Sequence, residues 1–101
     1  MQSKCTRTFW VKFDIYYSKD YKKAVKKLDK ESLQALVCVI DRLANDENLE
    51  LKFKDHELKG NLKGFRECHI KPNLLLVYKK VRQELRLSVL RVGSHSELFK
   101  E

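Results

Sequence analysis

The fold is decided by residues 54–99, which read KDHELKGNLKGFRECHIKPNLLLVYKKVRQELRLSVLRVGSHSELF. This stretch holds all three histidines, all three glycines and the only proline of the 101-residue chain. The residues that predict breaks between elements are Gly60, Gly64, Pro72, Asn73 and Gly93. Between the breaks we expect strands at residues 65–71, 74–78 and 84–92. The middle strand is apolar without alternation, so we expect it to be covered at least partly on both faces.

The first half of the chain is predicted to form one strand and two helices. Apolar and polar residues alternate over residues 8–16, which is the period of a half-buried strand. Ser18 and Asp29 are suited to cap two amphipathic helices, and Ser94 is suited to cap a final helical turn. The predicted fold class is therefore α+β, with an N-terminal strand, an antiparallel helical hairpin, a three-stranded antiparallel sheet segment and a short C-terminal helical turn.

Length and charge limit the kinds of protein this can be. We expect one domain over residues 1–101, with residues 1–11 as a loose N-terminal extension. The net charge of +8 makes a polyanion the first partner to consider, although excess lysine also keeps small proteins soluble. No apolar run is long enough to span a membrane or to form a secretory signal, so we expect a cytoplasmic protein with no membrane partner.

Polar residues of the second half are expected to meet on one face of the sheet. In the strand at residues 65–71, alternation places Glu67, His69 and Lys71 on one side. A carboxylate beside an imidazole can orient the ring, but the same spacing also fits a surface ion pair at a sheet edge. His56 enters the sheet and Arg91 ends its last strand, with His95 four residues later. Convergence of three histidines and an arginine favours a functional site.

Two kinds of chemistry compete for these histidines. Their positions contain no helical i, i+4 pair, and Cys68 is expected to face away from His69, so we predict no metal and no cofactor. Cutting RNA without a metal needs a base for the 2′-hydroxyl proton, an acid for the leaving 5′-oxygen and cations for the phosphate charge. Histidine can serve in either proton-transfer role near neutrality. Arg91 and nearby lysines suit the phosphate, and Phe99 offers a face on which a base can stack.

Three segments, KDHELKG, FRECHIKPNLLLVY and LRVGSHSELF, resemble the YafQ branch of the RelE superfamily. These are ribosome-dependent mRNA interferase toxins of bacterial type II toxin-antitoxin systems. The resemblance implies a microbial-RNase-like sheet, cleavage of mRNA on the ribosome and a small antitoxin protein as partner. It implies catalytic roles for the residues of the motifs, namely His95, His69, His56, Glu67 and Arg91. The residues expected to bind RNA are Phe99, Arg91, Lys54, Lys71 and Asn73.

One residue departs from the family pattern, and two other functions stay open. Asn73 stands where many relatives have aspartate, and an amide cannot act as a base. Our hypothesis is a metal-independent endoribonuclease in which His95 is acid or base and Glu67 orients a histidine. The alternatives are a gyrase-directed toxin like the ParE branch and a non-enzymatic RNA-binding module.

Overall fold

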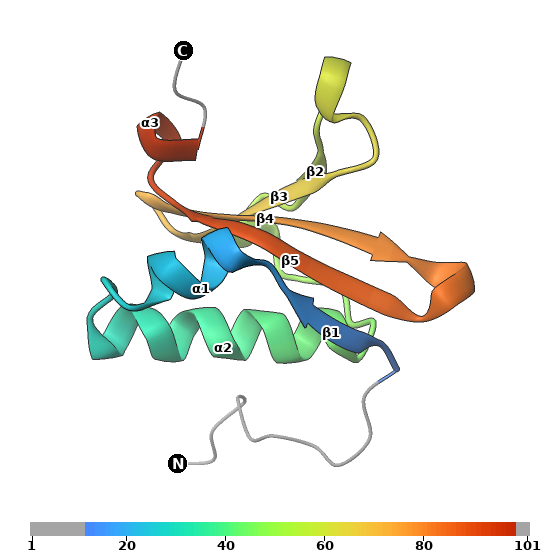
Figure 1. Cartoon of the computed structure of the whole chain (residues 1–101), viewed down its shortest axis with the longest axis horizontal. Coiled ribbons are helices and arrows are strands. Elements are labelled where there is room, and N and C mark those ends of the chain that lie inside the picture. Colours follow the sequence, from blue (N-terminus) through green and yellow to red (C-terminus); the bar gives the residue numbers. More distant parts are fainter. Residues whose placement is uncertain (1–11, 99–101) are drawn as a thin grey trace.

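The computed structural model describes residues 12–98, which form a five-stranded sheet with helices on one side. Figure 1 shows α1 and α2 lying together against one face of the sheet, with α3 at the end of β5. The strands are β1 (Asp14–Tyr17), β2 (His56–Glu57), β3 (Arg66–Lys71), β4 (Leu74–Val81) and β5 (Arg86–Gly93). The helices are α1 (Lys19–Val25), α2 (Lys30–Ala44) and α3 (His95–Leu98), with 3-10 turns at Leu51–Phe53, Gly60–Leu62 and Arg82–Glu84. The predicted α+β class is confirmed.

Both long helices begin where the sequence predicted. The Ser18 hydroxyl accepts a hydrogen bond from the backbone N–H of Tyr21 at 3.0 Å, which caps α1. Asp29 is the N-cap residue of α2. The apolar stripe of α2 packs on the sheet, although Leu33 and Val37 at its margin are 37% and 36% exposed. The helical hairpin therefore covers one face of the sheet, as the binary pattern indicated.

The order of the strands is β1-β5-β4-β3-β2, so the first strand of the chain pairs with the last described one. β1 runs parallel to β5, and the other neighbours are antiparallel. The expected N-terminal strand at residues 8–16 is shorter in the described chain, where β1 spans Asp14–Tyr17 and residues 8–11 lie outside the described range. β2 was not predicted, because a two-residue strand has no periodicity to read.

The core has two parts, one on each face of the sheet. The larger cluster joins α2 to the sheet and contains Leu36, Leu76 and Leu87, none of which is exposed. The smaller cluster, on the other face, consists of Leu75, Val77 and Leu98 with Leu58 and Phe65 packed against it. All five residues of the apolar run at 74–78 are buried, which confirms the prediction of a strand covered on both faces. We call the face with the smaller cluster the open face, because α1 and α2 do not cover it.

A register shift between His69 and Lys71 corrects one expectation from strand alternation. Lys71 pairs with Leu74, a residue of the larger core, so its side chain lies on the helix-covered face. There its Nζ lies 3.7 Å from the Glu31 carboxylate of α2. The prediction that Lys71 shares a face with Glu67 and His69 is therefore wrong, because a bulge adds a residue that regular alternation does not count.

A second register shift falls between Val77 and Tyr78, where β5 carries one extra residue, Leu90. Beyond this bulge Arg91 pairs with Val77 and faces the open side of the sheet. The bulge also coincides with the place where the backbone N–H of Ser18 donates to the Val89 carbonyl at 3.0 Å. Among the helices of residues 12–98, none combines the length and the apolar composition needed to cross a bilayer.

Candidate active site

The most direct contact among the predicted site residues joins His56 and Glu67, which are cross-strand partners in β2 and β3. His56 Nε2 lies 3.3 Å from Glu67 Oε1. His56 Nδ1 lies 2.7 Å from the carbonyl oxygen of Lys54. Lys54 has a φ of 50°, and this left-handed conformation ends the 3-10 turn just before β2. Because both ring nitrogens face oxygen acceptors, a doubly protonated imidazolium satisfies both contacts.

Glu67 is an unusual carboxylate, because it is buried with one oxygen unpaired. Its residue exposure is 5%, whereas the His56 side chain is 49% exposed. Within residues 12–98 the Oε2 atom of Glu67 is fully buried and has no hydrogen-bond partner. Burying a charged group with an unsatisfied oxygen lowers stability, so its presence here points to function rather than to stability. The sequence placed Glu67 beside His69 of the same strand, but the structure pairs it with His56.

Arg91 lies in the same cross-strand row as this pair. Glu67 is opposite Val77 in β4, and Val77 is opposite Arg91 in β5. Directly opposed residues share a face, so the order across the open face is His56, Glu67, Val77 and Arg91. We call this set the catalytic row, after the role that we propose for it below. The exposed Arg91 stands two strands from Glu67, or roughly 10 Å of sheet. A phosphate between β3 and β5 would therefore face a histidine on one side and a guanidinium on the other.

His95 is held at the end of β5 by a reciprocal cap. The Ser94 hydroxyl accepts from the Glu97 backbone N–H at 3.3 Å, and Glu97 Oε1 accepts from the Ser94 backbone N–H at 2.8 Å. This capping box starts α3 at His95 and confirms the predicted cap at Ser94. A Cβ at Gly93 would lie 2.7 Å from Glu97 Oε1, so a larger residue there would displace the Glu97 carboxylate. The exposed His95 thus lies four residues after Arg91, just beyond the end of β5.

His69 reaches the same face but does not belong to the catalytic row. It pairs with Leu75, which in turn pairs with Gly93, so it lies in the next cross-strand row towards α3. His69 also lines a cavity of about 700 Å³ between α2, the 3-10 turn at Leu51–Phe53 and the turn after β3. The structure therefore brings His56, Glu67 and Arg91 into one row and places His69 and His95 at its α3 side.

The residues expected to bind RNA are spread more widely. Lys54 is exposed, and its described contribution to the site is the carbonyl that holds His56. Asn73 is exposed in the turn between β3 and β4, two residues after Lys71. Phe99 lies outside the described residues. Of the five, Arg91 alone belongs to the catalytic row.

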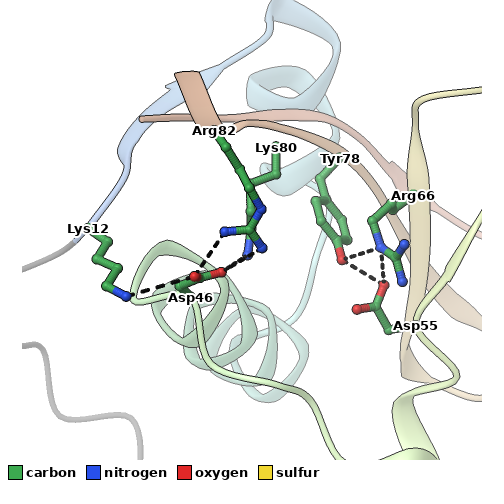
Figure 2. Close-up of polar contacts among 7 residues, drawn as sticks. All are labelled: Lys12, Asp46, Asp55, Arg66, Tyr78, Lys80 and Arg82. Carbon is green, nitrogen blue, oxygen red and sulfur yellow. Dashed lines mark hydrogen bonds and ion pairs between the residues drawn. The ribbon is translucent and has the colours of Figure 1, made fainter. Parts of the chain in front are cut away.

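Sequence reasoning missed a partly buried polar cluster of Asp55, Arg66 and Tyr78, which Figure 2 shows. The Tyr78 hydroxyl donates to Asp55 Oδ1 at 2.6 Å, and Arg66 Nε donates to the same oxygen at 3.2 Å. Burial, reinforced by the bond to Asp55, raises the pKa of Tyr78 far above its usual range. Because Asp55 immediately precedes His56, this cluster fixes the chain entering β2. Asp55 belongs to the motif KDH, but the sequence does not indicate that its partners lie in β3 and β4.

A second cluster in Figure 2 ties the far end of the sheet to α2. Asp46, with a φ of 61° just after α2, accepts from both Nη atoms of Arg82 at 3.0 and 3.1 Å and from Lys80 Nζ at 3.1 Å. Lys12 Nζ is 3.9 Å away. Hydrogen bonds from Arg82 and then from Lys80 lower the pKa of Asp46 to about 2. This cluster holds the β4–β5 hairpin in place and lies apart from the histidines.

The donor set does not favour a metal. Within residues 12–98 no group of three or more His, Cys, Asp or Glu side chains is arranged to hold a metal ion. Cys68 has no exposed surface, and burial raises the pKa of its thiol well above the usual range, so it is unsuited to act as a thiolate ligand. Both nitrogens of His56 already face protein oxygens.

Comparison with known proteins now gives this site a family. The sequence model of the family described as "Bacterial toxin of type II toxin-antitoxin system, YafQ" matches residues 11–100. This chain is a YafQ-family toxin. It is 36% identical over 90 residues to the mRNA interferase toxin YafQ of Escherichia coli strain K12, covering 88% of this chain and 94% of that relative. The resemblance predicted from the three motifs is thus confirmed.

Solved structures of YafQ-family and related toxins share the fold. A metal-bound toxin from Helicobacter pylori is 48% identical with a TM-score of 0.77, covering 86% of this chain and 99% of that one. The toxin of the Escherichia coli DinJ-YafQ complex is 33% identical with a TM-score of 0.69, covering 86% of this chain and 98% of that one. The arrangement of helices and sheet described above is therefore that of the YafQ family.

Proposed function

We propose that this toxin is an endoribonuclease that cuts mRNA on the ribosome by histidine acid–base catalysis. The observation that carries the proposal is the catalytic row, in which a buried carboxylate holds His56 opposite Arg91, with His95 at the end of the same strand as Arg91. The name of the Escherichia coli relative, an mRNA interferase toxin, supplies the substrate class. Ribosomes and mRNA meet in the cytoplasm, so we place the activity there.

The residues divide the reaction as follows. A base removes the proton from the 2′-hydroxyl, whose oxygen attacks the adjacent phosphorus, and an acid donates a proton to the departing 5′-oxygen. His95 serves in one of these two roles, because it is exposed and is placed by the cap of α3. Arg91 stabilises the additional negative charge that develops on the phosphoryl oxygens. No metal is required, because proton transfer and charge stabilisation both come from side chains.

His56 is suited to the cationic role in this scheme. Its two nitrogens face the Lys54 carbonyl and the Glu67 carboxylate, and the protonated ring donates to both. A charged ring held in this way can bind the phosphate or donate a proton. Glu67 fixes the ring orientation, as a buried carboxylate does for a catalytic histidine in other hydrolases. His69 lies one row closer to α3 and shares proton transfer or phosphate binding with them.

The alternatives explain less of the molecule. An RNA-binding module needs only surface charge, and it gives no reason to bury Glu67 with an unpaired oxygen beside a histidine. A gyrase-directed toxin gives no role to the catalytic row. The family match also favours RNA cleavage over both. An antitoxin protein is the expected second partner, since the related Escherichia coli toxin is found in a complex with DinJ.

The test maps RNA ends after the toxin is added to translating ribosomes. We expect new ends with the wild type and a loss of at least ~100-fold for His95→Ala, because a proton-transfer group is removed. Ser96→Ala is the matched control, since Ser96 is the next exposed residue of α3. Wild-type toxin treated with a chelator and then desalted should cut equally well. Equal cleavage by wild type and His95→Ala would contradict the assignment.

A further inference from the structure

A surface cavity of about 230 Å³ lies at the edge of the sheet next to the catalytic row. It is lined by Lys23 of α1, by Lys27 in the turn just after α1, by Arg91 of β5 and by Glu97 of α3. Figure 1 shows α1 and α3 at the same end of the sheet, beside the end of β5. Arg91 therefore belongs both to the catalytic row and to this cavity.

The topology explains why α1 meets Arg91. β1 pairs with β5 only as far as Val89, so the following residues of β5 have no strand on that side. α1 takes the place of the missing strand. The Ser18 backbone N–H donates to the Val89 carbonyl at 3.0 Å, and the Ser18 hydroxyl bonds the Leu90 carbonyl. These bonds fix the start of α1 to β5, so the helix is held at a defined distance from Arg91.

The cavity carries an excess of positive charge. Lys23 lies in α1 and Lys27 in the turn that follows it, and both line the cavity. Within residues 12–98, no ion pair involves Lys23, Lys27 or Arg91. Two carboxylates, Asp20 and Glu97, also line the cavity, and Glu97 accepts a hydrogen bond from the Ser94 backbone N–H. Three cations thus face two carboxylates, one of which is already engaged.

We propose that Lys23 and Lys27 bind the RNA phosphate that neighbours the cleaved linkage. The proposal rests on the function proposed above. RNA carries one phosphate per nucleotide, so a strand whose scissile phosphate is at Arg91 must place another phosphate close by. Arg91 lines the cavity, so the cavity adjoins the place proposed for the scissile phosphate. Its two lysines are free to neutralise the charge of the neighbouring phosphate. This subsite fixes the register of the strand before cleavage, and α1 becomes part of the substrate-binding surface.

The test measures RNA binding without cleavage, in the His95→Ala background. The probe is a short, fluorescently labelled single-stranded RNA followed by anisotropy between 50 and 200 mM salt. Each phosphate contact on single-stranded nucleic acid contributes a slope of about 0.7 in log affinity against log salt. We therefore expect Lys23→Ala/Lys27→Ala to flatten the slope by about 0.7. The variant should bind RNA more weakly than the parent, and this difference in affinity should shrink roughly threefold as the salt rises from 50 to 200 mM.

The matched control is Lys22→Ala/Lys26→Ala. These lysines are exposed, Lys22 in α1 and Lys26 at its C-terminal end, carry the same charge and do not line the cavity. We expect the control slope to match that of the parent. Melting temperatures of both pairs, measured beforehand, establish that α1 is intact. If the control pair flattens the slope as much as the cavity pair, the lysines act only through overall charge and the proposal is overturned.

A second measurement locates the phosphate. RNA probes with one neutral methylphosphonate linkage, moved along the strand, should reveal one position at which Lys23→Ala/Lys27→Ala has no further effect. Equal effects at every position would overturn the proposal. Unchanged RNA binding with weakened binding of an acidic antitoxin would assign the cavity to antitoxin carboxylates instead, and would also overturn it. These binding readouts do not depend on cleavage, so they stand or fall separately from the proposed reaction.

Discussion

Replacing the buried Glu67 with glutamine should make the toxin more stable and less active. The carboxylate is 5% exposed, its Oε2 atom has no partner within the described chain, and its Oε1 atom pairs with a half-exposed histidine. Glutamine keeps the shape of the side chain and removes the charge. Its amide can donate to Nε2 of a neutral His56 whose Nδ1 donates to the Lys54 carbonyl.

The expected magnitude follows from two opposing contributions. An unsatisfied buried polar group costs about 1–3 kcal/mol, and more when it is charged. The ion pair with His56, whose side chain is 49% exposed, stabilises the fold by only about 0–1 kcal/mol. Glu67→Gln should therefore stabilise the fold by about 1 kcal/mol, which raises the melting temperature of a domain of this size by roughly 4–8 °C. Cleavage should fall about 100-fold or more, because the charge that orients the imidazolium is lost.

Urea unfolding and RNA-end mapping on translating ribosomes measure the two effects. Glu57→Gln is the control, since Glu57 is the exposed neighbour of His56 in β2 and its Oε2 accepts from the Gly64 N–H at 3.2 Å. We expect this control to change stability by less than about 0.5 kcal/mol and to leave cleavage near the wild-type level. The reasoning is refuted if Glu67→Gln loses 1 kcal/mol or more, or if it cuts RNA as fast as the control.

Three further predictions concern the support of the site. Tyr78→Phe should destabilise the fold by about 1–2 kcal/mol in urea unfolding, because it removes the buried donor to Asp55; an unchanged midpoint would contradict this. Asp46 has a pKa lowered to about 2, so its contribution to stability is present above about pH 4 and is lost as the pH falls through 2. Asp46→Asn should therefore flatten the dependence of stability on pH between 4 and 2, and parallel acid titrations of variant and wild type would exclude the effect. Gly93→Ala should displace the Glu97 carboxylate and break the capping box, at about 0.5–2 kcal/mol. Faster amide exchange confined to α3 is the expected readout, and unchanged exchange there would argue against the clash.

Much of the fold could be predicted from the sequence because the signals were local. The side chains of Ser18 and Ser94 cap helices as predicted, and Asp29 occupies the N-cap position of α2 without a side-chain cap bond. The unbroken apolar run at residues 74–78 indicated a strand buried on both faces. The gap between the strands expected at residues 74–78 and 84–92 holds a 3-10 turn at Arg82–Glu84. Each of these signals depends on neighbours a few residues away.

The rest could not be predicted, because it depends on contacts between distant residues. The parallel pairing of β1 with β5 leaves no mark in either strand. The bulge after His69 moves Lys71 to the other face, although the alternation of the sequence is regular. At the site, the sequence placed the histidines near one another but assigned Glu67 to the wrong histidine contact, since the contact with His56 runs between strands. The roles of these residues in catalysis stay predictions.

The parallel pairing of β1 with β5 has a consequence for when the toxin becomes dangerous to the cell that makes it. Paired residues such as Asp14 and Arg86 are 72 positions apart, and closing a loop of that length costs roughly 4 kcal/mol of chain entropy. β5 is the last described strand to leave the ribosome, and both Arg91 and the anchor for α1 belong to it. A nascent chain therefore cannot assemble the catalytic row during synthesis. The catalytic row is completed only after β5 has left the ribosome.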